Sequence, residues 1–312
     1  MIPVIHDGDH GGDDFITSLL FLSYAEKFKL LGITTVAGNT NSLQAGLNAL
    51  KAISLANRQD VEVHQGSENP FRIKYRLSDD AFGSDGLGGV DFPTADRAIL
   101  SKKDAVTWMA EQLGVAIIPV TICATGPLTN IAKLLTEFPE LHNKIEQIVI
   151  MGGGTEPAGN IKPYAEFNFY MDPDAAHLVL NGPVPVVLHT LNTTQSAVYT
   201  SDRQSKLKAA LPELLAGKID SVMRITEDLE KKTFGAEGSF FHDHQVCAFL
   251  NMPENYELKF FNARVLCDPE TESGRLMLEP VDKGNLRVVT RIKDIDAMFD
   301  FILEGLRRIT AR

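Results

Sequence analysis

The sequence predicts an α/β fold with an open, mostly parallel sheet flanked by helices. Short apolar runs of strand length alternate with amphipathic runs of helix length through most of the chain. Strands that alternate with helices are joined by right-handed crossovers, which place the strands parallel in one sheet. With 312 residues, of which 44% are hydrophobic, the chain can bury a large core. We therefore expect a single catalytic domain over residues 1–312.

The expected strands are short runs rich in β-branched residues. In chain order they cover residues 2–6, 30–36, 61–64, 116–123, 147–151, 184–191, 260–267 and 286–290. The expected helices carry apolar residues three and four positions apart, as Phe15, Leu19 and Leu22 do in the first. They cover residues 13–28, 44–56, 104–113, 128–135, 174–180, 207–215, 220–231 and 294–306. Trp108 falls on the inward face of its helix, so we expect it in the core.

Composition and charge restrict the partners. The formal net charge is −11, from 30 Lys and Arg against 41 Asp and Glu. A nucleic-acid or membrane surface needs clustered basic residues, so we expect neither partner and instead a small molecule. No apolar run approaches the roughly 18 residues of a membrane span, and no signal segment precedes the first strand. Cys123, Cys247 and Cys267 lie in apolar contexts typical of reduced core residues. These features predict a cytoplasmic protein.

Four aspartates crowd into eight residues directly after the first expected strand: Asp7, Asp9, Asp13 and Asp14. Like charges this close repel and raise one another's pKa unless a cation offsets them. A hard divalent metal ion is the simplest such cation. The alternative is a turn that caps the following helix, but a cap needs one carboxylate rather than four. The cluster therefore favours a metal site.

Other polar or glycine-rich segments also follow expected strands. They cover residues 37–39, 124–127 and 151–154. In an open parallel sheet, ligands bind outside the carboxyl ends of the strands. We expect these segments to meet the aspartate cluster at one edge of the sheet.

A set of motifs keeps its order along most of the chain. It comprises an Asp-x-Asp-x-Gly-x-Asp-Asp signature at 7–14, then residues 32–39, 124–132, 148–153, 160, 165–168, 172–176 and 242–243. In this order the motifs resemble the inosine-uridine type nucleoside hydrolases, which cleave the N-glycosidic bond of ribonucleosides to give ribose and free base. The resemblance implies that fold and activity, no organic cofactor, and assembly as a homodimer or homotetramer.

The resemblance also implies a calcium ion at the base of the pocket. The matching ligands are Asp9, Asp14, Asp243 and the main-chain carbonyl of Thr125. Ligation by oxygen alone suits calcium better than zinc, which draws on His and Cys. Calcium would hold the attacking water and lower its pKa, and Asp9 matches the general base that takes the water's proton. Asp7 has no assigned ligand role and is expected to orient the loop.

Ribose recognition is assigned by the same resemblance. Asp13, Asn39 and Asn168 match contacts to the 2′- and 3′-hydroxyls, and Asn160 and Glu166 match contacts to the 5′-hydroxyl. Carboxylates around the sugar would stabilise the positive charge of an oxocarbenium-like transition state. Taken alone, Asn39 after Gly38 is more typical of an ordinary turn than of a ribose contact. Glu166 and Asn168 alternate as they would on a half-exposed strand.

His242 matches a histidine that protonates or polarises the departing base in pyrimidine-tolerant members of the family. An ordinary histidine pKa of about 6.5 suits that role at neutral pH. The simpler alternative is a structural histidine. His244 forms a His-x-His pair with His242 that also fits zinc, but no second His or Cys cluster has metal-ligand spacing.

Three positions depart from the family pattern. His10 stands where proline is usual, facing either the pocket or the solvent. Phe82 stands where many members carry a second pocket histidine, and it either stacks on the base or covers the core. Residues 188–194 lack an aspartate that is often present, which indicates altered support for the site.

The resemblance places mobile flaps over the base in two regions. One is the loop around residues 70–90, and the other precedes His242 and contains Phe234, Phe240 and Phe241. Flaps that close exclude water and order the leaving group. We expect base preference to lie there.

Three other functional classes share some of these sequence features. In a haloacid-dehalogenase-like magnesium phosphatase, Asp7 would be the nucleophile and Asp9 the acid/base, but the lysine and late acidic pair it requires have no clear match. A Rossmann oxidoreductase needs Gly-x-Gly-x-x-Gly spacing, which residues 152–154 lack. A non-catalytic nucleoside-binding relative would fit the three departures but not the intact metal aspartates.

Overall fold

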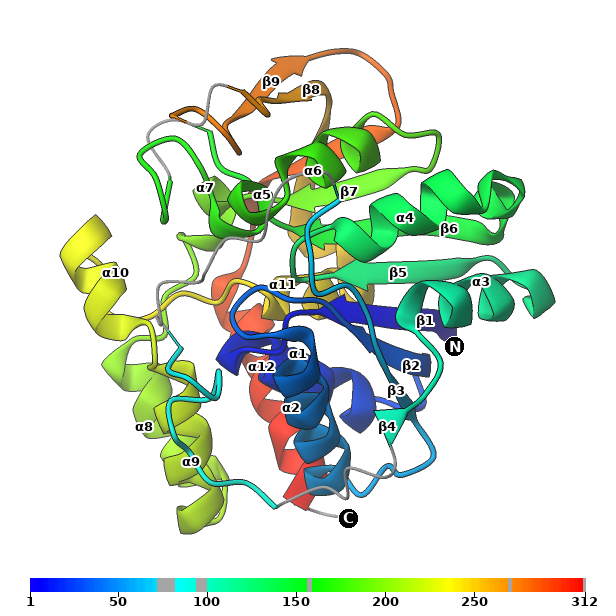
Figure 1. Cartoon of the computed structure of the whole chain (residues 1–312). Helices are drawn as coiled ribbons and strands as arrows, with labels where there is room; N and C mark the ends of the chain where they lie inside the picture. The colour runs from blue at the N-terminus through cyan, green and yellow to red at the C-terminus, as the bar shows by residue number, and fades with distance from the viewer. Residues whose placement is uncertain (72–81, 94–99, 156–158, 269–270, 311–312) are drawn as a thin grey trace.

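A ten-stranded sheet organises the computed structural model, which describes residues 1–71, 82–93, 100–155, 159–268 and 271–310 (Figure 1). The strands lie in the order β4-β3-β2-β1-β5-β6-β7-β10-β8-β9. Their bounds are β1 Ile2–Gly8, β2 Phe28–Thr35, β3 Glu62–Gln65, β4 Leu100–Ser101, β5 Val120–Ala124, β6 Ile145–Met151, β7 Val186–His189, β8 Tyr256–Val265, β9 Leu276–Pro280 and β10 Leu286–Ile292. The strands from β4 to β10 in that order are parallel, and β8 pairs antiparallel with both β10 and β9. The predicted open, mostly parallel sheet is confirmed.

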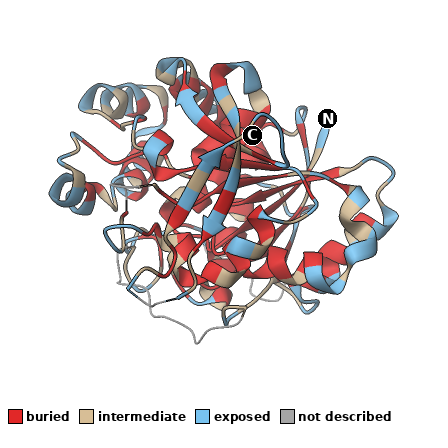
Figure 2. Ribbon diagram, turned by 90° about the horizontal axis from the view of Figure 1, so that it is seen from above, coloured by how far each residue is buried: buried red, intermediate tan, exposed pale blue. Residues whose placement is uncertain are grey.

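Helices cover both faces of this sheet. They are α1 Gly12–Ser23, α2 Ser42–Leu55, α3 Ala105–Val115, α4 Thr129–Glu137, α5 Phe167–Met171, α6 Pro173–Leu180, α7 Leu191–Thr194, α8 Ser201–Ala210, α9 Glu213–Met223, α10 Glu227–Phe234, α11 His244–Asn251 and α12 Ile295–Thr310. Short 3₁₀ helices lie at Pro139–Lys144 and Pro253–Asn255. Figure 2 shows the central strands buried between the helical layers, whose outer sides are exposed. None of the helices described is long and apolar enough to cross a membrane.

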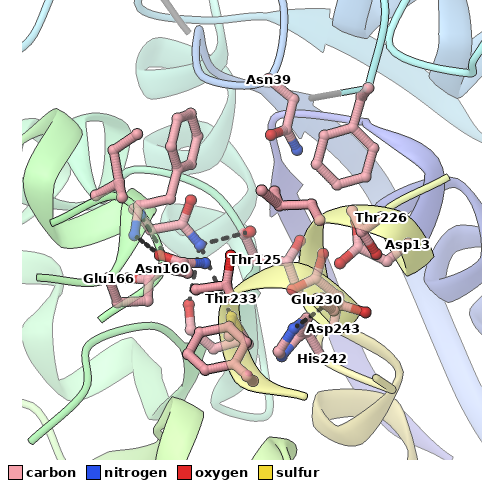
Figure 3. Close-up of a pocket in the computed structure, with 17 residues that line it drawn as sticks. Asp13, Asn39, Thr125, Asn160, Glu166, Thr226, Glu230, Thr233, His242 and Asp243 are labelled. Atoms are coloured by element: carbon pink, nitrogen blue, oxygen red, sulfur yellow. Dashed lines mark hydrogen bonds and ion pairs between the residues drawn. The ribbon is translucent and has the colours of Figure 1, made fainter. Parts of the chain in front are cut away.

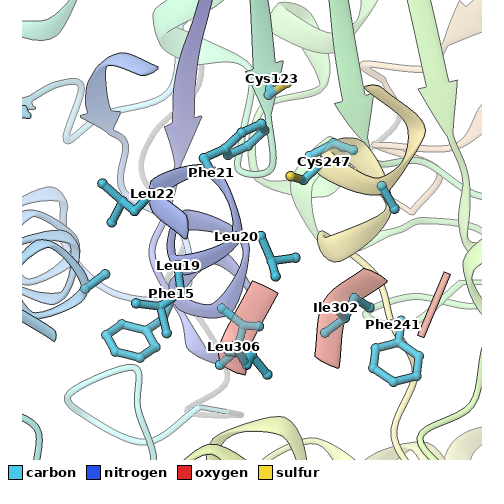
Figure 4. Close-up of a cluster of buried hydrophobic side chains, with 14 of the residues drawn as sticks. Phe15, Leu19, Leu20, Phe21, Leu22, Cys123, Phe241, Cys247, Ile302 and Leu306 are labelled. Carbon is cyan, nitrogen blue, oxygen red and sulfur yellow. The ribbon is translucent and has the colours of Figure 1, made fainter. Parts of the chain in front are cut away.

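Two hydrophobic clusters lie on opposite faces of the sheet, because side chains alternate along each strand. In β1, Val4 belongs to the cluster with α1, α2, α9, α11 and α12, whereas Ile5 belongs to the cluster with α3, α4 and α6. Helix α1 lies at the centre of the first cluster, where Phe21 faces Cys123 and Cys247 and Leu20 faces α12 (Figure 4). The strands that carry the site are therefore held from both sides.

The parallel strands end level with one another. Asp7 near the end of β1 pairs with Thr34 of β2 and with Ala124 of β5. The segments that follow β1, β2 and β5 therefore leave the sheet at one edge, as predicted. Helix α1 begins there, and Asp13 and Asp14 in its first turn suit the positive end of the helix dipole.

Several expected elements were placed wrongly. The strand expected from residue 116 begins at Val120, because the apolar residues Ile117 and Ile118 before it are 99% and 63% exposed. The helices expected at 207–215 and 220–231 each span a break: Pro212 separates α8 from α9, and the backbone turns between α9 and α10. Proline cannot continue a helix, so the first break could have been predicted from the sequence.

Single-residue expectations for the core are largely confirmed. Trp108 is buried and stacks on His64, with ring centroids 4.4 Å apart. Cys123 and Cys247 are buried thiols. Cys267 is only half-buried, because it lies in the segment that follows β8, so its assignment to the core was wrong.

Candidate active site

A pocket of about 300 Å³ opens where the carboxyl ends of the strands meet α10 (Figure 3). Most of the predicted substrate and catalytic residues line it. Its lining consists of Asp13, Asn39, Phe82, Thr125, Met151, Asn160, Ile161, Glu166, Phe167, Asn168, Thr226, Leu229, Glu230, Thr233, Phe234, His242 and Asp243. Figure 3 shows Asn160 and Glu166 on one side of the pocket and Asp13 and Asp243 on the other. Segments far apart in the sequence thus form one site.

Three carboxylates converge at one end of this pocket. Oxygens of Asp13, Asp14 and Asp243 lie within 4.8 Å of one another. Burial raises the pKa of Asp14 and Asp243 well above the usual range, and the charges of the neighbouring aspartates raise it further. The Thr125 hydroxyl donates to Asp14 Oδ1 over 2.5 Å. Crowded, buried oxygen donors with no basic partner among these contacts fit a hard divalent cation, which would offset their repulsion.

Asp9 is fully buried and is not one of these three carboxylates, so the converging set contains Asp13 where the resemblance assigned Asp9 as a metal ligand. The main-chain nitrogen and side-chain amide of Asn39 donate to its two carboxylate oxygens over 2.8 and 3.0 Å. A Cβ atom at Gly38 would lie 2.0 Å from Asp9 Oδ2, so only glycine lets the chain approach this closely. Burial raises the pKa of Asp9 to about 7. Asp9 is therefore held rigidly and can exchange a proton near neutral pH.

Asp7 does not reach the pocket. It is fully buried, and its Oδ1 accepts hydrogen bonds from the Thr34 hydroxyl (2.5 Å) and from the Asn130 amide (2.8 Å). Burial raises its pKa to about 6. Asp7 thus joins β1 to β2 and α4. This placement gives it no access to substrate, which a phosphatase nucleophile would need.

His10 faces neither the pocket nor the solvent, so both expected orientations were wrong. Its ring is fully buried. The Ser18 hydroxyl lies between two histidines, 3.0 Å from Nε2 of His10 and 3.0 Å from Nδ1 of His6. His6 Nε2 in turn lies 2.9 Å from the Thr125 hydroxyl. The φ of His10 is 36°, a value that proline cannot adopt. The substitution for proline is therefore part of a buried polar network.

The predicted ribose residues lie on the far side of the pocket. Glu166 caps α5, accepting from the main-chain nitrogens of Asn168 (2.8 Å), Phe169 (3.1 Å) and Gly153 (2.7 Å). It therefore does not lie on a strand. The amide of Asn168 donates to the carbonyls of Thr125 and Met151.

Asn160 is fixed in a similar way, because its Oδ1 accepts from the main-chain nitrogen of Phe167 over 2.9 Å. Asn39, on the opposite wall, is held by Asp9. Hydrogen bonds within the protein thus hold the side chains of Asn39, Asn160, Glu166 and Asn168, which were predicted to bind ribose.

His242 is held at both ring nitrogens. Nδ1 lies 2.7 Å from the Thr194 hydroxyl, and Nε2 donates to Glu230 Oε1 over 3.2 Å. Burial alone would lower the pKa of His242, but the hydrogen bond and charge of Glu230 raise it above the usual value. Glu230 and Thr194 were not predicted. No sequence spacing marks them, because both contacts depend on how α10 and α7 pack.

Aromatic side chains form the outer wall. Phe82 and Phe234 line the pocket as expected, and the Phe240 ring contacts that of His242 edge-on at 5.7 Å. Phe241 instead lies in the core against Tyr199, so its assignment to a flap was wrong. Of the loop expected around residues 70–90, residues 72–81 lie outside the described part of the chain.

The model of one protein family, the inosine-uridine preferring nucleoside hydrolases, matches residues 4–300. The chain belongs to that family. It is 36% identical over 310 residues to the pyrimidine-specific ribonucleoside hydrolase RihA of Shewanella woodyi, covering 97% of both chains. This nucleoside hydrolase also superposes on a solved plant nucleoside hydrolase with a TM-score of 0.87 at 25% identity, covering 98% of both chains. A solved inosine-guanosine nucleoside hydrolase gives a TM-score of 0.85 at 26% identity, covering 99% of this chain and 98% of that one.

The family membership decides between the enzyme classes considered. The chain is a hydrolase of ribonucleoside N-glycosidic bonds. The phosphatase alternative is further weakened by the buried position of Asp7. The aspartate cluster at the base of the pocket agrees with a metal-dependent hydrolase.

Proposed function

We propose that this hydrolase attacks the anomeric carbon of a ribonucleoside with a water molecule activated by Asp9 and by a calcium ion. Asp9, Asp14, Asp243 and the Thr125 carbonyl would hold the ion. When bound, calcium lowers the pKa of the attacking water. Calcium is proposed over zinc because the converging donors are carboxylates, and the cluster found among the described residues includes no His or Cys.

One observation carries the proposal: a single pocket has converging carboxylates at one end and a buried histidine paired with a glutamate beside it. In the proposed reaction, the water loses a proton to Asp9 as its oxygen bonds to the anomeric carbon. The N-glycosidic bond breaks, and its electron pair leaves with the base. To donate a proton or a hydrogen bond to that base, His242 would give up the contact of its Nε2 with Glu230, because Thr194 holds its Nδ1. Protons and charges balance when solvent returns His242 and Asp9 to their starting states.

The ribose would lie between the two walls of the pocket. Asp13, Asn39 and Asn168 are proposed to bind the 2′- and 3′-hydroxyls, and Asn160 and Glu166 the 5′-hydroxyl. Because Glu166 and Asn168 are fixed by backbone hydrogen bonds, little ordering remains to be done when substrate binds. Their oxygens would also stabilise positive charge as it develops on the ribose.

The substrate class proposed is ribonucleosides as a whole. Relatives with the same fold carry names that specify pyrimidine nucleosides in one case and inosine and guanosine in another. We assign base preference to the wall formed by Phe82, Phe234 and α10, since the carboxylate end faces the ribose and not the base.

Release of reducing sugar from inosine, uridine, cytidine and adenosine tests the proposal. Purified protein with calcium is expected to release ribose from at least one of them. The Asp9→Ala variant should retain its circular dichroism spectrum and lose about 10³-fold in kcat. Undiminished turnover by this variant would remove Asp9 from the mechanism. The expected homodimer or homotetramer and the cytoplasmic location stay predictions, the first of which light scattering can test.

A further inference from the structure

We propose that Asn48 is a positioning residue for the base wall, the wall formed by Phe82, Phe234 and α10, and that it holds Phe82 in place at the pocket. This inference rests on the function proposed above, which assigns base preference to that wall. Asn48 lies on α2, does not line the pocket and belongs to none of the sequence motifs. It acts through the turn formed by residues 82–89, which we call the Phe82 turn.

The Phe82 turn is held together by its own hydrogen bonds. The main-chain nitrogen of Gly88 donates to the Phe82 carbonyl over 2.9 Å, which closes the turn. Within it, Oδ1 of Asp85 accepts from the main-chain nitrogens of Leu87 and Gly89, over 3.1 Å each. The Leu87 side chain is fully buried in the core. Phe82 and Asp85 are therefore linked, so a shift of one is passed to the other.

The side-chain amide of Asn48 joins this turn to the loop that carries the aspartates. Its Nδ2 atom donates to the carbonyl of Asp85 over 2.7 Å and to the carbonyl of His10 over 3.0 Å. An amide nitrogen has two N–H donors, so both are used. Gln44 Nε2 donates to Oδ1 of Asn48 over 3.1 Å, which fixes the orientation of the amide. One fully buried group thus sets the spacing between the two loops.

Gly86 shows how closely the turn is docked on the aspartate loop. A Cβ atom at Gly86 would lie 2.8 Å from Cγ2 of Thr40 and 3.2 Å from Nδ2 of Asn48. It would also lie 3.5 Å from the carbonyl oxygen of His10. The φ of Gly86 is 73°, which favours glycine as well. Gly89 has the same φ, but a Cβ atom there would meet nothing within 4 Å.

The contacts of Asn48 therefore connect the two walls of the proposed site. His10 adjoins Asp9 in the chain, so the amide of Asn48 fixes Phe82 relative to the carboxylates that would surround the ribose. A wall that is held in place before the substrate binds leaves less freedom to be lost on binding. Displacing Phe82 would remove a contact with the base and leave the ribose contacts unchanged. We therefore expect Asn48 to affect the binding of the base and not the cleavage of the bond.

The central test compares a nucleoside with free ribose, which has no base to contact the wall. Asn48→Leu keeps the approximate volume of the side chain but removes both N–H donors. We expect KM for the best nucleoside to rise about 2- to 10-fold, the range for loss of an aromatic contact, with kcat changed less than about twofold. The inhibition constant of ribose as a competitive inhibitor should change less than about twofold. An equal change in both constants would place the effect of Asn48 at the carboxylates and overturn the proposal.

Two glycine variants disturb the docking from the side of the turn and keep Asn48 intact. Gly86→Ala places a methyl group against Thr40 and Asn48, so it should raise nucleoside KM as Asn48→Leu does. Gly89→Ala is the matched control, because it has the same strain from a positive φ but meets no neighbour. An equal rise in KM for the two glycine variants would assign the effect to backbone strain and overturn the proposal. This pair also tests the proposal if Asn48→Leu does not fold.

A double-variant cycle shows whether Asn48 acts through Phe82. In a Phe82→Ala background, Asn48→Leu should change nucleoside KM by less than about twofold, because the ring that it positions is absent. The full effect in that background would overturn the positioning role. Gln44→Ala controls for damage to α2, since it removes a contact with Oδ1 of Asn48 and leaves both N–H donors in place. Its kinetic constants should match those of wild type.

Hydrogen exchange gives a readout that does not depend on turnover. Asn48→Leu should speed exchange of the amides in residues 83–89, and an unchanged rate would overturn the proposal. If wild-type protein releases no ribose from any nucleoside, the proposed function falls and the role of Asn48 in base binding falls with it, even where exchange shows the docking. If wild-type protein is active and Asn48→Leu matches its KM, only this inference falls.

Discussion

The two ends of the pocket are built in different ways. At the carboxylate end, Asp9, Asp14 and Thr125 follow strands that end level at the sheet edge, and all three are buried. At the opposite end, where we propose that the base binds and which we call the base end, the wall comes from α10 and from loops. Phe82 and Phe234 there are only half-buried, and Leu229 is 45% exposed.

Under the proposed function, this difference separates bond cleavage from base selectivity. Groups fixed to a sheet edge keep their geometry while loops and an outlying helix change, so bond cleavage and base choice can vary independently. The names of the relatives agree with that division, because hydrolases named for different bases share this fold.

The largest effect is expected at the carboxylate end. Asp14→Asn keeps the acceptor for the Thr125 hydroxyl but removes a charge from the cluster. We expect kcat to fall about 10³-fold for every active nucleoside, because several kcal/mol of electrostatic stabilisation is lost. Steady-state assays over the panel measure this. Asp202→Asn, on the exposed surface of α8, is the control. A loss of kcat confined to nucleosides of one base would contradict the proposed separation of bond cleavage from base preference.

Removing the metal should affect stability as well as activity. Without a cation the buried carboxylates repel, so chelation is expected to lower Tm by about 5 °C or more, and added calcium should restore it better than magnesium. Differential scanning calorimetry measures the shift. Phe234→Ala, at the base end, should show the same dependence on calcium. An unchanged Tm after verified metal removal would argue against a structural ion.

The histidine beneath the carboxylates should make stability depend on pH. Burial lowers the pKa of His10 from 6.5 to about 4. Between pH 4 and pH 6.5, the folded state therefore binds fewer protons than the unfolded state. The stability that the neutral His10 ring contributes is fully present above pH 6.5 and is lost as the pH falls towards 4. At pH 5 the loss is about 2 kcal/mol. Asn tolerates the positive φ at this position.

Urea unfolding of wild type and His10→Asn at pH 7.5 and pH 5 tests the expectation. The variant should become less destabilised, relative to wild type, by about 2 kcal/mol at the lower pH. A difference that does not change with pH would show that the pKa of His10 is the same in the folded and the unfolded protein.

The smallest effect is expected at the base end, where Phe82 has two possible roles. If it stacks on the base, Phe82→Leu should raise KM about 2- to 10-fold with kcat less affected, since an aromatic face contributes about 0.5–1.5 kcal/mol. If it covers the core instead, Phe82→Leu should leave KM unchanged and Phe82→Ala should lower Tm. Kinetics and calorimetry on both variants separate the roles.

Much of the carboxylate end was predictable from the sequence, and at the other end the sequence marked Phe82, Phe234 and His242 but not Glu230 or Thr194. Asp13, Asp14, Thr125 and Asp243 belong to motifs at strand ends or next to α11, and the structure brings them together. Alternation of strands and helices is a local signal, and a parallel sheet then fixes which edge the loops share. Assignment of individual ligand and ribose roles stays a prediction.

Tertiary contacts account for what the sequence did not reveal. The pairing of Glu230 with His242 depends on the path of the chain after α10, and no periodicity encodes that path. Burial of His10 depends on Ser18 and His6, which form a polar network inside a helix and strand that otherwise look apolar. Phe241 lies next to His242 in sequence, but the alternation of side chains turns it into the core.

The distance along the chain between Asp14 and Asp243 also bears on how the protein is made. The first carboxylates emerge from the ribosome 229 residues before the last one (243 − 14). At 5–20 residues per second, this interval lasts about 10–50 s. During that time the N-terminal aspartates cannot have the complete ligand set, and β1 and α1 must persist without it. Under the proposed ligand assignment, the cation site would close late in biogenesis, and a chain that stops before α11 would carry the first aspartates without Asp243.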